Sequence, residues 1–473
     1  MDGISCVKGE IHNVLAVLRI TGRGRSSRIG GGGLFDLGSV GGGGGGRKVE
    51  VLRHQLIASL KELHLFLGLQ QSAGLRLRDI DCRIVVRPFC DVMLCRGIGG
   101  MDVMSVTLTA LHKLLLYGLL TAECLFCGEA MNQVLLEALF AMKFGDDDVH
   151  SISRSDSELI DIRTQEILLE LVRSSAGTLL TDDRVCLCVQ KCFEMRSYHG
   201  AYHGTNDCLM VRYTENVVIQ MVLLIFSKMK ALSPSHSVRD QDPVRGFGIK
   251  AMARIFKYLT VIIDPNQVDS DQHVRSFGLR LIIVALETAG HHLNDHRELI
   301  AILQDDLCRQ LLINSQSAHF LILSLTLRVI FDLFNAVKEH IRVQLEVFFI
   351  SIHLRIAESV HTDPEHKELV LESIVEFCRE PDLIVGLYTN YDCQVSDGAD
   401  CCHGLTLCAH SLSLHFFENI FKFEIMTMAP LCARTLRSAP LTFLRIYAIS
   451  CSTKPLLAAP GDPDRDQAAA QCR

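Results

Sequence analysis

The chain has 473 residues, with 54 acidic and 47 basic side chains and a net charge of −7 at neutral pH. Hydrophobic residues make up 48% of the chain and charged residues 21%, which excludes an intrinsically disordered protein and allows a large core. The acidic balance argues against a general nucleic-acid-binding surface, because such a surface needs basic side chains to displace counterions. The 19 cysteines lie mostly in apolar helical patterns, and the N-terminus does not resemble a signal peptide, so we expect reduced, buried thiols in a cytoplasmic protein.

Apolar residues at helical spacing begin at Ile4 and continue to about residue 20. Residues 21–47 are rich in glycine, and we expect a flexible loop there. Helical periodicity then continues to about residue 390. The expected helices cover 49–69, 84–95, 102–120, 122–143, 157–174, 182–196 and 206–230, followed by 246–263, 272–289, 295–313, 317–335, 337–358, 364–379 and 381–390. The longest apolar stretches are shorter than the roughly 20 residues of a membrane-spanning helix, so none is expected.

Long helices joined by short turns, without the alternating pattern of strands, predict an all-α fold. Their number and order favour an armadillo or HEAT-like α-solenoid in two blocks. The first block covers residues 1–232 and includes the glycine-rich insert, and the second covers residues 246–393. A polar linker at 233–245 separates them, and residues 394–473 lose the periodicity, so we expect a poorly ordered tail.

No local motif predicts a catalytic residue, a cofactor or a metal. The glycine run before Lys48 lacks the hydroxyl residue and the preceding strand of a phosphate-binding loop. The Cys-x-x-Cys pair at 124–127 lacks both a second pair and the βαβ context of a redox motif, and the aspartates at 146–148 fit a solvated turn. One group has zinc-ligand types but lies mostly on one predicted helix, which favours buried helix cysteines: Cys186, Cys188, Cys192, His199 and His203.

The most specific feature is a polar tetrapeptide at the end of the last predicted helix, formed by Asn390, Tyr391, Asp392 and Cys393. Polar side chains there can bond to the free backbone groups of a helix end. A tyrosine can bury its ring while its hydroxyl stays paired. The residues alone predict a cap that locks one repeat onto the next, and a partner contact is the alternative.

The segment LVLESIVEFCREPDLIVGLYTNYDC, which ends in this tetrapeptide, resembles the HUS box of the large Arf guanine nucleotide exchange factors. Further collinear segments resemble the same family, nearest to its Golgi-specific brefeldin A-resistance branch: 85–93, 106–120, 171–198, 278–290, 303–311 and 337–349. In that family a dimerisation and cyclophilin-binding domain and a HUS domain, both armadillo-like, precede the catalytic exchange domain. No loop of these 473 residues resembles the loop that carries the family's catalytic glutamate, so we expect no intrinsic exchange activity.

The resemblance implies the regulatory and dimerisation region of an Arf exchange factor in Golgi vesicle-mediated transport and Arf signal transduction. It implies a homodimer formed through the first block and an intramolecular contact between the blocks. For the full-length family member it implies an Arf-family GTPase and the Golgi membrane as partners, with a cytoplasmic location at the periphery of that membrane. The alternative is an unrelated HEAT-type scaffold or adaptor in membrane traffic.

Overall fold

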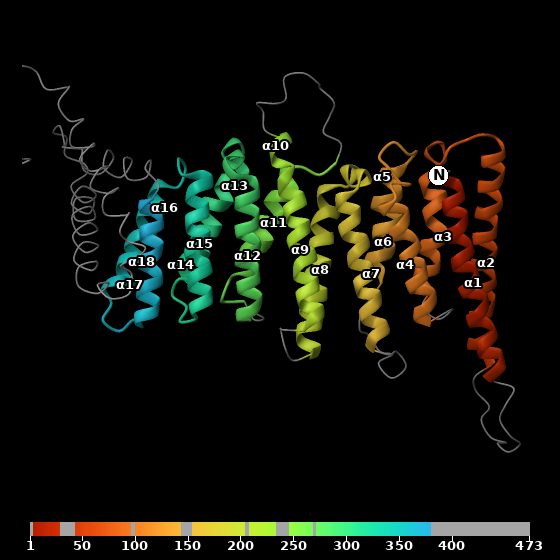
Figure 1. Cartoon of the computed structure of the whole chain (residues 1–473), viewed down its shortest axis with the longest axis horizontal. Helices are drawn as coiled ribbons and strands as arrows, with labels where there is room; N and C mark the ends of the chain where they lie inside the picture. Colours follow the sequence, from red (N-terminus) through yellow and green to blue (C-terminus); the bar gives the residue numbers. More distant parts are fainter. Residues whose placement is uncertain are drawn as a thin grey trace, which may run out of the picture. The chain divides into compact units, whose positions relative to one another are not determined.

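The computed structural model describes residues 3–28, 43–95, 100–142, 154–203, 208–232, 246–267 and 271–379. Every regular element within these ranges is a helix, which confirms the all-α, solenoid-like fold (Figure 1). The assignment to an armadillo or HEAT type stays a prediction. Contacts divide the chain into two compact units. Unit 1 consists of Met1–Ile313 and Asp332–His340, and unit 2 consists of Asn314–Phe331 and Ile341–Arg473.

The helices that lie in or begin in unit 1 are α1 (Gly3–Arg28), α2 (Gly43–Ser72), α3 (Cys82–Leu94), α4 (Gly100–Leu116), α5 (Cys127–Glu129), α6 (Leu136–Ala141), α7 (Arg154–Arg173), α8 (Asp182–His203), α9 (Leu209–Ser227), α10 (Met229–Leu232), α11 (Ile249–Ile262), α12 (Gln272–Ala289), α13 (Arg297–Ala301) and α14 (Cys308–Asn314). Short 3-10 turns lie at Leu77–Asp79, Ser175–Leu179 and Gly290–Asp295. Two π-helical turns, Ala130–Leu135 and Ile302–Leu307, join α5 to α6 and α13 to α14.

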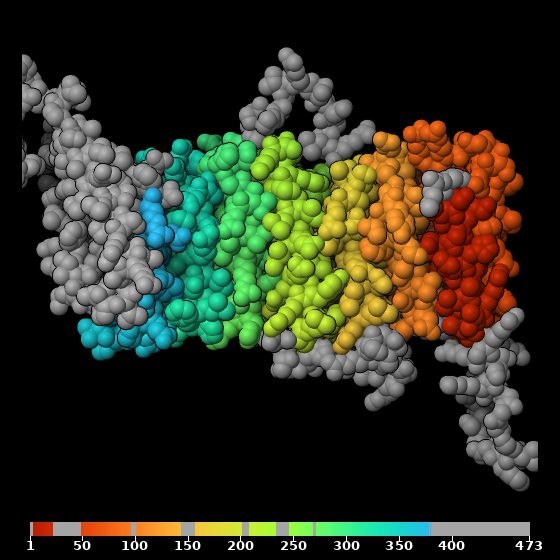
Figure 2. Space-filling view, viewed as in Figure 1, coloured from red at the N-terminus to blue at the C-terminus, as the bar shows by residue number. Residues whose placement is uncertain are grey.

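Unit 1 is built as two rows of helices. In the first row α1, α4, α7, α9 and α12 pack in succession, each against the next. In the second row α2 contacts α3, and α8 contacts α11. The rows are joined where α2 packs on α1, α3 on α4, α8 on both α7 and α9, and α11 on α12. Figure 2 shows the surfaces of these helices following one another in chain order. Each helix therefore buries its apolar stripe against neighbours in sequence, as in a solenoid.

The pair α11 and α12 shows how the pattern produces the packing. Buried residues of α11 recur at positions 251, 252, 255, 256 and 259, which lie on one face of a helix. On α12, a side chain at Gly278 would meet a side-chain carbon of Ile263 at 2.8 Å and one of Ile262 at 3.0 Å. Glycine at this position therefore lets the two helices approach closely, and alanine here would force them apart.

Unit 2 contains the first part of α15 (Phe320–Val337), followed by α16 (Arg342–Phe348), a π-helical turn at Phe349–Leu354, α17 (Arg355–Glu358) and α18 (Pro364–Cys378). Helix α18 packs against α17 and the π-helical turn. Its fully buried residues are Val370, Ile374 and Phe377, at the i, i+4 and i+7 positions of one face. Pro364 occupies the first helical position, where its missing N–H costs nothing.

Two sequence expectations need correction. The loop expected at 21–47 is shorter, because α1 continues to Arg28 and α2 already begins at Gly43. Once α1 and α2 are packed together, each further helical residue adds a backbone bond without a new nucleation cost. The helix expected at 122–143 begins only at Cys127, after a turn. The linker 233–245, the helix expected at 381–390 and the tail 394–473 lie outside the described residues. The domain boundaries therefore stay a prediction.

Two helical stretches, Leu209–Leu232 and Phe320–Val337, have the length and hydropathy of a membrane span. Of these windows, 50% and 67% are buried within the structure. The core helices of soluble proteins meet the same criteria, so this composition is weak evidence for a membrane span.

Candidate functional site

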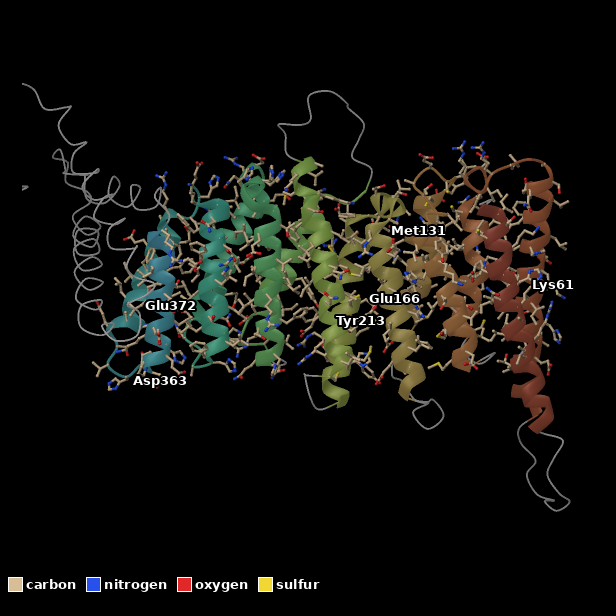
Figure 3. All side chains as sticks on the ribbon, viewed as in Figure 1. Lys61, Met131, Glu166, Tyr213, Asp363 and Glu372 are labelled. Atoms are coloured by element: carbon tan, nitrogen blue, oxygen red, sulfur yellow. The ribbon has the colours of Figure 1, made fainter. Side chains whose placement is uncertain are left out.

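Asn390, Tyr391, Asp392 and Cys393 lie outside the described residues, so their roles stay predictions. The described element that leads toward them is α18, on which Figure 3 labels Glu372, with Asp363 just before its start. The segment that resembles the HUS box begins within α18, so the packing of α18 on its neighbours is the described structure nearest to the tetrapeptide.

A buried histidine lies behind α18. His353 belongs to the π-helical turn and is 0% exposed. One ring nitrogen lies 3.3 Å from the carbonyl oxygen of Phe348, and the other lies 3.2 Å from Oγ of Ser373 on α18. The ring of Phe377 packs on two neighbouring rings, with centroid distances of 5.2 Å to Phe349 and 5.9 Å to His353. Burial lowers the pKa of His353 to about 4, so the ring is neutral at physiological pH and acts as a hydrogen-bonding core residue.

The junction between the two predicted blocks is formed by α8 and α9 on one side and α11 and α12 on the other. Helix α11 begins after Gly248, which has no side chain to cap it. Asp182, at the start of α8, supplies the acceptor instead. Its Oδ1 accepts hydrogen bonds from the backbone N–H groups of Gly248 and Ala251, at 2.8 and 3.2 Å. The neighbouring Asp183 pairs with Arg254 of α11. A carboxylate from the first block therefore caps the first long helix of the second.

Aromatic side chains fill the junction below this cap. The ring of Phe193 stacks on Phe277 at 5.5 Å and meets Tyr258 edge-on at 5.8 Å. Arg196 is 1% exposed, and its guanidinium lies 5.2 Å from the centre of the Phe277 ring and 2.8 Å from a carboxylate oxygen of Glu215. Because this charge is buried, removal of the Glu215 carboxylate would leave it uncompensated.

Asn132 fixes a second contact inside unit 1. It lies in the first π-helical turn, and its side-chain amide donates to the carbonyl oxygens of Gly128 and Leu179, at 2.7 and 3.0 Å. Its side-chain oxygen accepts from the backbone N–H of Thr181 at 3.1 Å. These bonds hold the chain immediately before α8, and so they help to place Asp182.

A polar contact also joins α4 to α7. Glu166 of α7 lies 2.7 Å from the guanidinium of Arg163 and 3.6 Å from Nδ1 of His112 on α4. Figure 3 labels Glu166 and Tyr213, which belong to α7 and α9. Burial raises the pKa of Tyr213, and the Glu166 carboxylate adds to the rise. This environment favours the neutral phenol.

The zinc-like group is described for its three cysteines and His199, and the side chain of His203 lies outside the described residues. The thiol of Cys186 donates to the carbonyl oxygen of Ala251 at 3.6 Å, while Cys188 and Cys192 are fully buried. His199 pairs with the buried Asp161 of α7, with 3.0 Å between Nε2 and Oδ2. Burial raises the pKa of Asp161, and the hydrogen bond from His199 opposes this rise. Within the described ranges, no group of three or more His, Cys, Asp or Glu residues is arranged to hold a metal ion.

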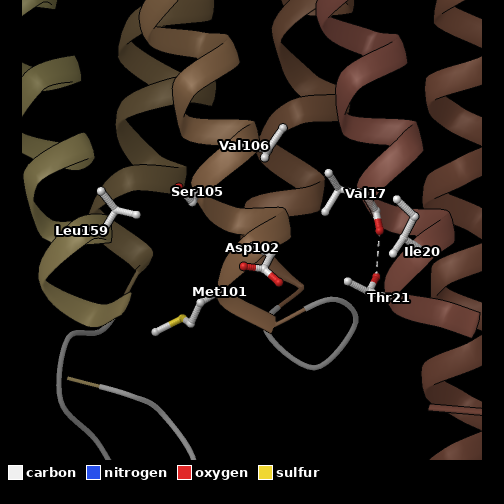
Figure 4. Close-up of a pocket in the computed structure, with 8 residues that line it drawn as sticks. All are labelled: Val17, Ile20, Thr21, Met101, Asp102, Ser105, Val106 and Leu159. Carbon is white, nitrogen blue, oxygen red and sulfur yellow. Dashed lines mark hydrogen bonds between the residues drawn. The ribbon is translucent and has the colours of Figure 1, made fainter. Parts of the chain in front are cut away.

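A small cavity opens between α1, α4 and α7 (Figure 4). Its volume is about 310 Å³, and its lining is mostly apolar, with Val17, Ile20 and Leu159 among the residues. The hydroxyl of Thr21 donates back to the carbonyl oxygen of Val17 at 3.0 Å. Among the described residues of the lining, Asp102 is the one charged side chain. The cavity therefore lacks the convergent acid, base and nucleophile of a catalytic site.

One edge of unit 1 exposes apolar side chains. Helix α2 packs on α1 and α3 and leaves Leu65 and Leu69 67% and 70% exposed, one helical turn apart. Val51, nearer the start of the helix, is 57% exposed. Lys61, labelled in Figure 3, is also exposed and lies one turn before Leu65. We call Val51, Leu65 and Leu69 the α2 edge.

Comparisons of the sequence with known proteins indicate the class of protein to which the chain is related. Residues 248–398 match the family model described as Mon2/Sec7/BIG1-like, HUS domain. The chain is 25% identical over 429 residues to the ARF guanine-nucleotide exchange factor GNL1 of Arabidopsis thaliana, covering 73% of this chain and 29% of that protein. It is 23% identical over 426 residues to GNOM of the same plant, covering 73% and 28%. It is 28% identical over 158 residues to the Golgi-specific brefeldin A-resistance guanine nucleotide exchange factor 1 homolog of Caenorhabditis elegans, covering 32% and 8%.

The chain is thus an all-α, solenoid-like protein, and its residues 248–398 match the HUS domain model. The chain is homologous to the Arf guanine nucleotide exchange factors, which confirms the resemblance found in the sequence and weighs against an unrelated scaffold. It spans less than a third of the length of these curated relatives.

The sequence reasoning missed three residues of these contacts: Asp182, Asn132 and His353. Asp182 carries a weak signal, because it follows a threonine at a helix start, where acidic residues are common. Asp182 caps α11 of the next block and not its own helix, and the spacing of residues in the sequence does not reveal that partner. Asn132 and His353 lie within apolar helical patterns, and a polar residue there indicates a buried bond without naming the partner.

Proposed function

We propose that this chain is the regulatory region of an Arf guanine nucleotide exchange factor that acts in vesicle transport at the Golgi. The HUS domain match over residues 248–398, together with homology to exchange factors over 73% of the chain, is the observation that carries the proposal. An Arf-family GTPase is then the partner of the complete protein. The names of two relatives refer to the Golgi and to brefeldin A, which supports a peripheral location on the Golgi membrane.

A scaffold of stacked helices suits a regulatory role. Its extended surfaces bind other proteins, and its internal contacts fix one helical block against another. In this chain the Asp182 cap and the aromatic packing around Phe193 form such an internal contact within unit 1. We propose that the junction transmits the position of the first block to the HUS domain. The tetrapeptide at 390–393 would then form the next contact along the chain.

We further propose that the chain self-associates through the α2 edge, with a second copy as the occupant. Leu65 and Leu69 expose apolar surface at the start of the helical rows, where a symmetric dimer can pair identical patches. Leu65→Glu combined with Leu69→Glu places charges in that interface. The matched control is Val360→Glu, because Val360 is 88% exposed and belongs to unit 2.

The mass of the full chain in solution, measured by sedimentation equilibrium, tests this interface. We expect a dimer for the unchanged chain and for the Val360 variant, and a monomer for the double glutamate variant. A dimer that survives the double substitution would remove the α2 edge from the proposal. A monomeric unchanged chain at micromolar concentration would remove self-association itself.

The regulatory role is tested by binding to a separately produced exchange domain of an Arf exchange factor. We expect the full chain to retain this domain on a column, and Asp182→Ala to weaken retention by disturbing the junction. No retention at micromolar concentration would contradict the proposal. Asp183→Ala, one residue away, is the matched control, because its carboxylate pairs with Arg254 and not with the α11 backbone.

A further inference from the structure

A cavity of about 390 Å³ opens at one end of unit 1, where α1 begins and two inter-helix turns meet. The first turn, residues 73–81, leads from α2 into α3, and the second, residues 117–126, leads from α4 into α5. Figure 1 shows both turns at the end of the helical rows that is marked N. Two backbone hydrogen bonds join them: Cys82 N–H donates to the carbonyl of Leu125 over 3.0 Å, and Leu125 N–H donates to the carbonyl of Arg78 over 3.3 Å. The two turns therefore form one surface.

The lining of this cavity is basic. Arg76 and Arg78 belong to it, and both are exposed. The carboxylate of Asp79 holds the turn, because it accepts from the backbone N–H of Arg76 at 3.1 Å and lies 3.9 Å from Arg78. Within the described ranges, the guanidinium of Arg76 has no carboxylate partner. Thr121 adds a hydroxyl to the lining. Guanidinium and hydroxyl groups are donors that suit the oxygens of a phosphate.

Exposed apolar side chains adjoin the cavity. Leu75 is 41% exposed, Tyr117 is 65% exposed, and Leu125 and Phe126 are each 50% exposed. The first three of these are each next in sequence to a residue that lines the cavity. We call the four side chains the apolar rim. Leucine and aromatic side chains beside basic groups are typical of surfaces that bind a bilayer, where the apolar groups enter the interface and the basic groups meet lipid phosphates.

The exposed ring of Phe126 is held at a conformational cost. Phe126 has φ 56° and ψ 24°, and among the described residues it is the one non-glycine position with a positive φ. Such a conformation persists only where its surroundings enforce it, and it is often found at functional sites. Here the guanidinium of Arg83 lies 4.0 Å from the centre of the ring and binds Glu129 at 2.6 Å and Asp81 at 2.8 Å. Because two carboxylates neutralise Arg83, its contribution is to fix the turn beside the cavity.

We propose that this end of unit 1 binds a phospholipid with a phosphomonoester headgroup at a bilayer surface. The headgroup phosphate enters the cavity between Arg76 and Arg78, and the apolar rim enters the interface of the bilayer. A phosphomonoester presents three acceptor oxygens and a phosphodiester presents fewer, so a pair of guanidinium groups favours the monoester. The chain carries a net charge of −7, so this local pair of arginines, and not an overall attraction, selects the lipid. The choice of a bilayer over a soluble phosphate rests on the apolar rim and on the membrane location proposed above.

Sedimentation of the full chain with vesicles tests the proposal. Vesicles of phosphatidylcholine alone are compared with vesicles that also contain phosphatidic acid, which is the monoester probe, or phosphatidylserine at the same surface charge. We expect the phosphatidic acid vesicles to bind the chain about fivefold or more tightly than either of the others. Equal binding to the three kinds of vesicle, or binding to none, would overturn the proposal. Because neither Arf nor an exchange domain is present, this failure would leave the proposed regulatory role untouched.

The cavity is tested by removing its charges. Arg76→Gln combined with Arg78→Gln should abolish the preference for phosphatidic acid. The matched control is Arg280→Gln combined with Arg297→Gln, which removes the same net charge from exposed positions on α12 and α13. A preference that survives the first pair of substitutions, or one that the control pair reduces equally, would contradict the assignment of the phosphate to this cavity.

The apolar rim is tested by Leu125→Ser combined with Phe126→Gly. Glycine adopts a positive φ without strain, so the turn is kept, and circular dichroism checks that the variant is folded. We expect binding to phosphatidic acid vesicles to fall about fivefold or more, with the affinity for glycerol 3-phosphate in titration calorimetry unchanged. Leu209→Ser is the matched control, because Leu209 is 83% exposed at the start of α9.

Two results would assign the surface to another ligand and overturn the lipid proposal. An unchanged chain that binds glycerol 3-phosphate and no vesicle has a site for a soluble phosphate. A rim variant that keeps full vesicle binding and loses retention on a separately produced exchange domain has lost a protein contact.

Discussion

Replacing Asp182 by alanine is the sharpest perturbation of the junction. The substitution removes the oxygen that accepts from Gly248 N–H at 2.8 Å and from Ala251 N–H at 3.2 Å. A hydrogen bond to a charged group contributes about 1.5–3 kcal/mol, and a carboxylate at a helix N-terminus adds about 0.3–1 kcal/mol. Because Asp182 is half-buried, water can bind the freed N–H groups and recover part of this free energy. We therefore expect a loss of about 2 kcal/mol in the free energy of unfolding.

Thermal unfolding followed by circular dichroism measures this loss, which corresponds to a decrease of roughly 2–3 °C in Tm for a chain of this size. Asp182→Asn keeps one acceptor oxygen and should fall between alanine and the unchanged chain. In Asp183→Ala only a surface pair with Arg254 is lost, the two side chains being 70% and 55% exposed, so the expected cost is below about 1 kcal/mol. Equal effects of the two alanine substitutions would refute the assignment of Asp182 as the cap of α11.

Three further outcomes follow from the contacts described above. The folded pKa of His353 is lowered to about 4 from 6.5, so between these pH values the unfolded chain binds a proton that the folded chain excludes. The free energy of unfolding should therefore fall by about 3 kcal/mol as the pH decreases from 6.5 to 4. His353→Gln should remove most of this decrease when denaturation is measured across that pH range. Asn132→Ala leaves the N–H of Thr181 and the carbonyl of Leu179 without their partner and should lower the free energy of unfolding by about 1–3 kcal/mol in urea titrations, whereas Asn132→Asp should retain the bond to the N–H. Gly278→Ala should lower Tm by roughly 2–6 °C, because the added carbon meets Ile263 at 2.8 Å, and an unchanged Tm would contradict the close packing of α11 on α12.

Helical periodicity predicted the elements of this chain well where a single apolar face is buried. The expected helix at 272–289 has the observed bounds of α12, and the expected helix at 364–379 differs from α18 by one residue. The pattern works there because each helix packs on neighbours in sequence, so burial follows local spacing.

The candidate contacts were less accessible from the sequence. The backbone partner of Asp182, Gly248, lies 66 residues further along the chain. Spacing reports which face of a helix is buried and does not report which residue from another segment meets it. The π-helical turn around His353 also leaves no distinct signal in the periodicity, since the flanking residues continue an apolar helix.

The rate at which Arf releases a fluorescent guanine nucleotide tests the central proposal most directly. The rate is measured with a separately produced exchange domain of an Arf exchange factor, in the absence and presence of the 473-residue chain. We expect the chain alone to leave the spontaneous rate unchanged, and its addition to the exchange domain to change the catalysed rate by about threefold or more, with the effect reduced in Asp182→Ala. Strong stimulation by the chain alone, or a catalysed rate that saturating chain leaves unchanged, would contradict the account of a regulatory region.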